Sequence, residues 1–317
     1  MPSHEATYKQ DWPAYNAAQT NEKALFQSLL FDLCQQVEEP CYRFGRPRLP
    51  MREMLFAVVF KVYSTVSCRR FMCDLADAQT KGYLSGVPHF NSIFNYLELP
   101  EMTPILRDLI EQTSLALKSV ETTFAVDSSG FTTCQYVRWY DAKYGQEMER
   151  HDWLKVHLMC GVTTNIVTRV EVTGAYGSDS VQFAPLLEMT ARGFQIEHVV
   201  ADKAYSSRAN LGAVAQLGGM PYIPFRLNAR ARSREATLWD QLYHFYHLHR
   251  ETFLQHYHQR SLVESTFSMM KAKFGDALRS KTDTALVNEL LCKVLCHNIC
   301  VLIQSMYELG VPICFES

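Results

Sequence analysis

The spacing of apolar residues predicts that the first 120 residues are helical. Apolar residues recur at three- and four-residue intervals over residues 22–37, which is the period of one buried face of an α-helix. Further helices are predicted over residues 51–64 and 68–78, and a short one over residues 89–97 with Asn91 as its candidate cap. Short helices joined by tight turns are typical of helix-turn-helix units, but also of a plain helical packing domain.

The pattern changes near residue 122, where short β-branched and apolar runs begin. Strands are predicted over residues 122–126, 153–159, 166–173, 197–201 and 221–224. The helices between them are predicted over residues 181–192 and 206–218. This order indicates an α/β fold, with a mixed sheet flanked by helices.

The rest of the chain is predicted to be helical. Residues 226–256 are rich in Arg, His, Tyr and Phe and would form a short insertion with one helix over 239–255. Two further helices are expected over residues 258–274 and 284–308, the last of them strongly apolar. The predicted units are an all-α N-terminal domain (1–120), an α/β domain (121–309) and a C-terminal tail (310–317).

Composition adds little to this picture. The net charge is −2, so any nucleic-acid partner would be met by local basic patches. The 10 cysteines form no C-x-x-C pair, and neither a signal peptide nor an 18-residue apolar run is evident. We therefore expect free thiols, a cytoplasmic location and no membrane partner. Cys292, Cys296 and Cys300 recur on one helical face and are interpreted as buried apolar residues rather than a metal site.

Two aspartates occupy matching contexts. Asp127 and Asp202 each follow a short predicted strand and precede small residues. Ligands gather where strands end in open α/β sheets, so two such acids and a third on a packed helix would form a carboxylate site for Mg²⁺ or Mn²⁺. Two such ions can support phosphodiester chemistry. Taken singly, each aspartate could instead cap a turn or form a salt bridge.

The candidate third acid lies in a helical stripe of charged residues. Arg260, Glu264 and Lys271 are spaced by four and seven residues, and Tyr257 lies one heptad before Glu264. Residues at these spacings share one face of an α-helix. A carboxylate flanked by two cations is a sensible way to hold a metal-binding acid beside a phosphate backbone.

These residues carry a resemblance to a known family. Tyr257, Arg260, Glu264 and Lys271 match the Y-x(2)-R-x(3)-E-x(6)-K signature of one branch of the DDE transposases of bacterial and archaeal insertion sequences. Ala-Val-Asp127 and Val-Val-Ala-Asp202 are similar to the contexts of the first two catalytic acids. The resemblance extends over residues 122–305 and is looser before residue 120.

The resemblance implies an RNase H-like fold and a cut-and-paste transposase. Asp127, Asp202 and Glu264 would be the catalytic acids and would hold two Mg²⁺ or Mn²⁺ ions. The enzyme would cleave DNA at the terminal inverted repeats of a transposon and transfer the 3′-hydroxyl ends to target DNA. A homodimer in the complex that joins both ends, and a location at the nucleoid, are also implied.

Further residues are candidates for contact with DNA. By resemblance, Arg260 and Lys271 would contact phosphates, and Tyr257 would either contact a phosphate or support the helix. Lys203 could face DNA or be solvated, and Trp239 could stack on a flipped base or pack in the core. Lys155 and His157 share one strand face and could approach the metals or line a rim.

Two basic segments and one histidine cluster complete the candidates. Arg230, Arg232 and Arg234 belong to a run that is interpreted as a DNA-backbone contact, against a solvated loop. Arg46 and Arg48 could form an arm that enters a minor groove. The spacing of His244, His247 and His249 does not favour a zinc site.

Two other functions remain open from the sequence. A transposase retained only as a DNA-binding regulator would bind DNA without cleaving it, although all three acids are present here. A structure-selective nuclease on the same fold would cleave DNA without joining it.

Overall fold

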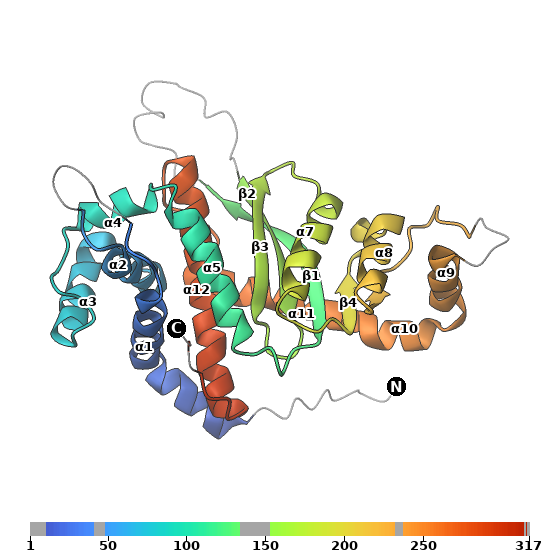
Figure 1. Ribbon diagram of the computed structural model, residues 1–317, viewed down its shortest axis with the longest axis horizontal. Coiled ribbons are helices and arrows are strands. Elements are labelled where there is room, and N and C mark those ends of the chain that lie inside the picture. The colour runs from blue at the N-terminus through green and yellow to red at the C-terminus, as the bar shows by residue number, and fades with distance from the viewer. Residues whose placement is uncertain (1–10, 41–47, 134–152, 232–236, 314, 316–317) are drawn as a thin grey trace.

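The computed structural model describes residues 11–40, 48–133, 153–231, 237–313 and 315. Five strands form one sheet in the order β3-β2-β1-β4-β5 (Figure 1). β1 is antiparallel to β2, and β2 to β3, whereas β4 is parallel to both β1 and β5. The strands are β1 (Thr123–Thr132), β2 (Trp153–Gly161), β3 (Val167–Gly174), β4 (His198–Ala201) and β5 (Met220–Tyr222). The sheet is mixed and helix-flanked, as in the RNase H-like fold that the sequence predicts.

Helices cover both faces of the sheet. Phe124 and Val126 of β1 pack in one apolar cluster with α7 (Asp179–Ala191) and α8 (Arg208–Gln216). Ala125, between them, packs in the other cluster with α11 (Ser261–Phe274) and α12 (Asp283–Glu308). This alternation follows from the two-residue period of a strand, and it decides which helix each later residue of β1 faces.

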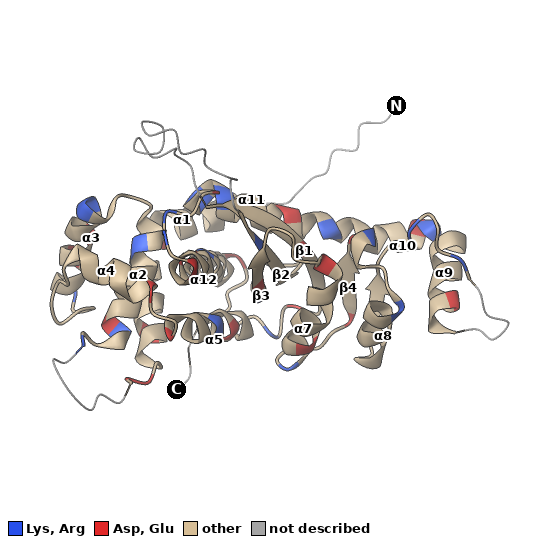
Figure 2. Ribbon diagram, turned by 90° about the horizontal axis from the view of Figure 1, so that it is seen from above, with Lys and Arg blue, Asp and Glu red and all other residues tan. Residues whose placement is uncertain are grey.

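The N-terminal region is helical, as predicted, and shares its core with α12. Its helices are α1 (Trp12–Gln35), α2 (Met51–Ser64), α3 (Cys68–Thr80), α4 (Phe90–Leu97) and α5 (Met102–Leu115). Their buried residues belong to the same apolar cluster as those of α12 and one face of the sheet. Figure 1 and Figure 2 show α12 between α1 and α2 on one side and the sheet on the other, with α5 beside it. The apolar core of the helical region is therefore completed by the last helix among the described residues.

Several predicted boundaries are wrong in informative ways. The first helix begins at Trp12, ten residues before the predicted start, where Asp11 accepts a hydrogen bond from the Ala14 N–H. The cap of α4 is His89, and Asn91 is the residue whose N–H it accepts. α5 was not predicted as a separate element.

The predicted single helix over 239–255 is two helices, α9 (Leu238–Leu248) and α10 (Arg250–Tyr257). They are separated at His249, whose backbone (φ −116°, ψ 45°) is not helical. A 3-10 turn over His258–Arg260 then separates α10 from α11. A helical sequence period persists across such short breaks, so the period alone does not reveal them.

One described helix, α12, is long and apolar enough to span a membrane by length and composition. Of its most apolar stretch, 89 % is buried inside the protein. Within the fold it is a central core helix.

Candidate active site

Asp127 and Asp202 lie on neighbouring parallel strands. The last parallel pair between β1 and β4 is Val126 with Ala201, and Asp127 and Asp202 are the next residues along the chain. For Asp202 the predicted position just after a strand is confirmed, since β4 ends at Ala201. For Asp127 it is wrong, because β1 continues to Thr132 along β2. Asp-Ser-Ser-Gly is turn-like in composition, but here the ladder with β2 holds it extended.

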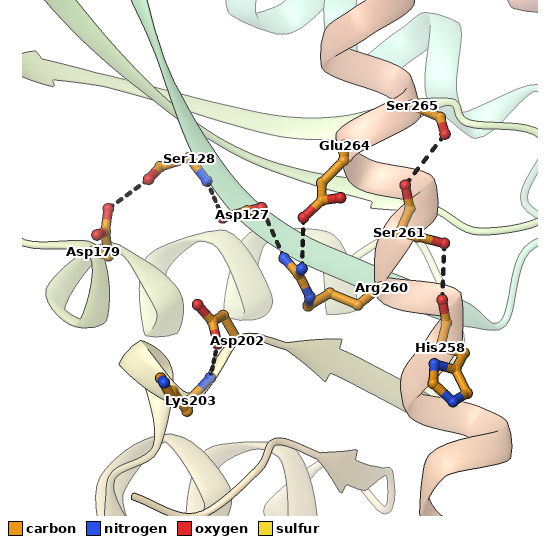
Figure 3. Close-up of polar contacts among 10 residues, drawn as sticks. All are labelled: Asp127, Ser128, Asp179, Asp202, Lys203, His258, Arg260, Ser261, Glu264 and Ser265. Atoms are coloured by element: carbon orange, nitrogen blue, oxygen red, sulfur yellow. Dashed lines mark hydrogen bonds and ion pairs between the residues drawn. The ribbon is translucent and has the colours of Figure 1, made fainter.

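The alternation of β1 sends Asp127 and Ser128 to opposite faces. Asp127 faces the helical segment that carries Arg260 and Glu264, and Ser128 faces α7 (Figure 3). The Ser128 N–H donates to Asp127 Oδ1 at 2.8 Å. One carboxylate oxygen of Asp127 is thus held by the strand, and the other faces Arg260.

Arg260 joins Asp127 to Glu264. Its Nη1 lies 3.2 Å from Asp127 Oδ2 and its Nη2 lies 2.5 Å from Glu264 Oε1. Figure 3 shows the guanidinium between the two carboxylates. The side chain of Asp127 is 22 % exposed, whereas that of Glu264 is 54 % exposed. The site therefore has a sheltered acid on the strand and a more accessible acid on α11.

The electrostatics of Asp127 depend on burial first and on charged neighbours second. Burial raises the pKa of Asp127, and the negative charges of Glu264 and Asp202 raise it further. The Ser128 N–H and Arg260 oppose these effects, but the pKa stays above its usual value. A carboxylate in this situation gains from a nearby cation.

The fit of this site to a divalent metal rests on its donor chemistry. Three carboxylates are the oxygen donors that Mg²⁺ and Mn²⁺ prefer. As the side chains stand, no group of three His, Cys, Asp or Glu within the described part of the chain is arranged to hold an ion. Arg260 binds both Asp127 and Glu264, and Asp202 Oδ1 accepts the Lys203 N–H at 2.5 Å. A bound cation would have to replace these partners.

The remaining signature residues lie around the acids. Lys271 Nζ donates to Ser129 Oγ at 2.7 Å and lies 5.1 Å from the centre of the Phe131 ring. Ser129 and Phe131 are on the same face of β1 as Asp127, so Lys271 continues the charged stripe. Tyr257 ends α10, so the stripe is not on one continuous helix.

The Tyr257 ring packs on an aromatic side chain, and its hydroxyl is near charged groups. Its ring stacks on Phe253 at 6.1 Å. Its pKa is raised chiefly by burial and also by Asp202, while Arg260 lowers it. The Tyr257 hydroxyl therefore lies within the electrostatic reach of both the second acid and the Arg260 guanidinium.

A fourth acid, Asp179, lies across β1 at the start of α7. Asp179 Oδ1 accepts the Ser128 hydroxyl at 2.7 Å and lies 2.7 Å from Lys155 Nζ. His157 Nδ1 is 3.3 Å from the same oxygen. Burial raises the pKa of Asp179, but the hydrogen bonds from Lys155 and Ser128 and the nearby positive charge outweigh it, so the pKa is lowered. The shared strand face of Lys155 and His157 was the available signal.

The other DNA-contact candidates are exposed or fall outside the described residues. Lys203 follows Asp202 and is exposed, and Arg48 and Arg230 are exposed too. Arg46, Arg232 and Arg234 fall outside the described residues.

Trp239 is packed against protein. Its ring meets Phe225 edge-on at 4.8 Å, and its Nε1 donates to the Arg230 carbonyl at 3.2 Å. Arg208 lies over the same ring at 5.4 Å. This geometry favours the packing interpretation of Trp239 over base stacking.

The histidine and cysteine clusters give no metal group among the described residues. His244, His247 and His249 are exposed on α9 and at its end. Cys292 and Cys296 are fully buried, and burial raises the pKa of both thiols well above its usual value. These thiols are inert core groups.

Comparison with known proteins identifies the family. The family model described as "Transposase DDE domain" matches residues 118–299, which is more than half of the chain and includes all three acids. A search of curated proteins finds no match. The chain belongs to the DDE transposase family, whose members act on DNA.

Proposed function

We propose that this protein is an active cut-and-paste transposase. It would bind the terminal inverted repeats of a transposon, cleave phosphodiester bonds there and transfer 3′-hydroxyl ends to target DNA. The observation that carries the proposal is that Arg260 joins Asp127 to Glu264, while Asp202 directly follows the strand that runs parallel beside Asp127. The raised pKa of Asp127 supports a site built for a cation.

Asp127, Asp202 and Glu264 would hold two Mg²⁺ or Mn²⁺ ions in this proposal. Bound there, the ions supply Lewis acidity for the attacking and leaving oxygens of phosphodiester cleavage. Arg260 would exchange its carboxylate partners for a phosphate of the cleaved strand, since a guanidinium binds both groups in the same forked geometry. Lys271, already anchored on β1, would contact the next phosphate, and Tyr257 would support Arg260.

We assign the DNA contacts outside the acid site by charge. Lys203 and the exposed Arg230, with Arg232 and Arg234, would follow the DNA backbone beyond the second acid. Residues 1–120, including Arg46 and Arg48, would recognise the transposon end, and residues 121–309 would carry the chemistry, followed by the tail over residues 310–317. Two transposon ends must be joined in one reaction, so a homodimer would act in the complex with DNA.

The test is metal-dependent cleavage of the DNA that flanks the coding region. Duplexes from both flanks are incubated with the purified protein and Mg²⁺ or Mn²⁺. Glu264→Gln should abolish cleavage, because the amide cannot donate a carboxylate, and leave DNA binding within about twofold. Glu251→Gln, which changes an exposed carboxylate on α10, is the matched control and should cleave normally. Normal cleavage by Glu264→Gln would show that the third acid is assigned wrongly.

The same assay separates the two other functions. A DNA-binding regulator would shift the flanking duplex in a gel but leave it intact in either metal. A nuclease would cut but give no joined product when a supercoiled target plasmid is added.

A further inference from the structure

A polar cluster lies beneath the proposed active site, on the α7 side of β1. One oxygen of Asp179, Oδ1, accepts from Ser128 and Lys155, each at 2.7 Å, and lies 3.3 Å from His157 Nδ1. Lys155 Nζ also donates to the Gly177 carbonyl, and His157 Nε2 contacts Thr173 Oγ1 at 2.9 Å. Asp179 and Lys155 are therefore each held by more than one partner, and His157 is held through Thr173.

This cluster occupies a layer that is otherwise apolar. Phe124 and Val126 of β1 and Met159 of β2 are fully buried on the same face. Within the cluster the His157 side chain is 0 % exposed, that of Lys155 is 18 % exposed and that of Asp179 is 28 % exposed. Charges in such a place lose solvation and seldom stabilise a fold more than apolar residues would. Packing alone does not explain why this apolar layer ends, beside Ser128, in the ion pair between Lys155 and Asp179.

Ser128 links this cluster to the first proposed catalytic acid. Its hydroxyl donates to Asp179, and its backbone N–H donates to Asp127 Oδ1 at 2.8 Å. In the β1–β2 register Ser128 lies opposite His157, so both flank Asp179 from adjacent strands. Any rotation of the strand at Ser128 would turn the N–H away from Asp127.

The turn after the second acid reaches the same point. Tyr205, in the turn that follows Asp202, is buried against Phe183 of α7. Burial raises the pKa of Tyr205, and the charges of Asp179 and Asp127 raise it further, so the hydroxyl lies near both. Ser128 and Asp179 therefore lie close both to the part of β1 that carries Asp127 and to the turn that follows Asp202.

We propose that Asp179 is a positioning residue of the catalytic site: it holds Ser128, and through the Ser128 N–H it fixes the orientation of the Asp127 carboxylate toward the metals. Lys155 keeps Asp179 ionised and in place from β2. This inference rests on the proposed role of Asp127 as a metal-binding acid. It assigns Asp179 no contact with DNA or metal.

The experiment measures Mn²⁺ binding to the DNA-free protein by electron paramagnetic resonance, beside single-turnover cleavage at saturating DNA. Ser128→Ala and Asp179→Asn should each weaken Mn²⁺ binding and slow cleavage by about 10- to 100-fold, as loss of a partner behind a metal ligand does. Ser128→Thr keeps the hydroxyl and should stay within about threefold of the wild type in both measurements.

Two controls separate positioning from a loss of folding. Glu171→Gln removes an ion pair with Arg107 in the same sheet, without a contact to Ser128, and should leave Mn²⁺ binding unchanged. Ser128→Ala keeps the Lys155–Asp179 pair, so its melting temperature should stay near that of the wild type even if Asp179→Asn is less stable. Wild-type Mn²⁺ affinity in both Ser128→Ala and Asp179→Asn would overturn the inference.

A further variant, Asp127→Asn, distinguishes a failure of this inference from a failure of the proposed function. If Asp127→Asn abolishes Mn²⁺ binding but the two positioning variants do not weaken it, only the role of Asp179 is wrong. If Asp127→Asn binds Mn²⁺ and cleaves like the wild type, Asp127 is not a catalytic acid and both proposals fall.

Discussion

Arg260 lies 3.2 Å from Asp127 and, through its second terminal nitrogen, ties that strand acid to Glu264 on α11. The guanidinium thus binds carboxylate oxygens that would be ligands of a divalent cation in the proposed site. In this state Arg260 acts as the counterion of the acid pair. In the proposed function, metal or DNA would first have to release Arg260 from these acids.

Replacing Arg260 should have opposite effects on metal binding and on cleavage. Arg260→Gln removes a positive charge beside two carboxylates, so Mn²⁺ should bind the DNA-free protein roughly tenfold more tightly, since a hydrogen bond to a charged group is worth about 1.5–3 kcal/mol. Cleavage should nevertheless fall, because the proposed phosphate contact is lost. Titration calorimetry with Mn²⁺ and single-turnover cleavage measure the two effects, and weaker Mn²⁺ binding by Arg260→Gln would contradict this account.

Lys271 should contribute one phosphate contact. It is anchored by Ser129 and the Phe131 ring beside the acids, so its ammonium lies on the proposed DNA path. In Lys271→Ala the slope of log K against log salt for DNA binding should be smaller in magnitude by about 0.9, the value for one phosphate of duplex DNA. Fluorescence anisotropy at several salt concentrations measures it. Lys118→Ala, at an exposed lysine, should keep the wild-type slope, and an equal slope in Lys271→Ala would remove Lys271 from the DNA path.

Asn298 should be a large contributor to stability. It is fully buried in α12, accepts the Val167 N–H at 2.9 Å and donates to the Val167 carbonyl at 2.8 Å. Asn298→Leu leaves both backbone groups buried without a partner, so the free energy of unfolding should fall by about 2–5 kcal/mol. Urea denaturation followed by circular dichroism measures this. Ser305→Ala, which loses only a hydroxyl bonded within α12, should change it by less than about 1 kcal/mol. A similar small change for Asn298→Leu would show that the sheet does not depend on this link.

His297 should make the fold sensitive to acid. It is buried, and burial lowers its pKa from 6.5 to about 4. Between these values the unfolded chain binds a proton that the folded protein does not, so the stability that neutral His297 provides is present above pH 6.5 and is lost as the pH falls toward 4. The loss is at most about 1.4 kcal/mol per pH unit. His297→Gln should flatten the pH dependence of the unfolding free energy over this range, and an unchanged dependence would mean that other groups cause it.

The helical stripe and the strand alternation could be recognised from sequence because each depends on near neighbours. Arg260 and Glu264 are one helical turn apart and pair as their spacing predicts. The alternation of residues 153–159 predicted β2 for the same reason. Both patterns show which face of a helix or strand a side chain occupies, and that face places Arg260 and Glu264 next to each other.

What the sequence did not reveal depends on partners that are distant in the chain. The extension of β1 past Asp127 comes from its ladder with β2, and nothing in Ser128, Ser129 or Gly130 favours a strand. Asp179 is likewise indistinguishable from an ordinary residue at the start of a helix until β1 and β2 place Ser128 and Lys155 against it. Tertiary pairing overrides local preference at both places.

The position of α12 has a consequence for the order in which the protein can fold. α1, α2 and α5 leave the ribosome early, yet α12, the helix that completes their apolar core, is made only after the whole sheet. Until then their apolar faces lack the partner that buries them, and such surfaces are where nascent chains aggregate or recruit chaperones. Folding of the N-terminal helices must therefore wait until α12 has been made, as must completion of the core beneath the sheet.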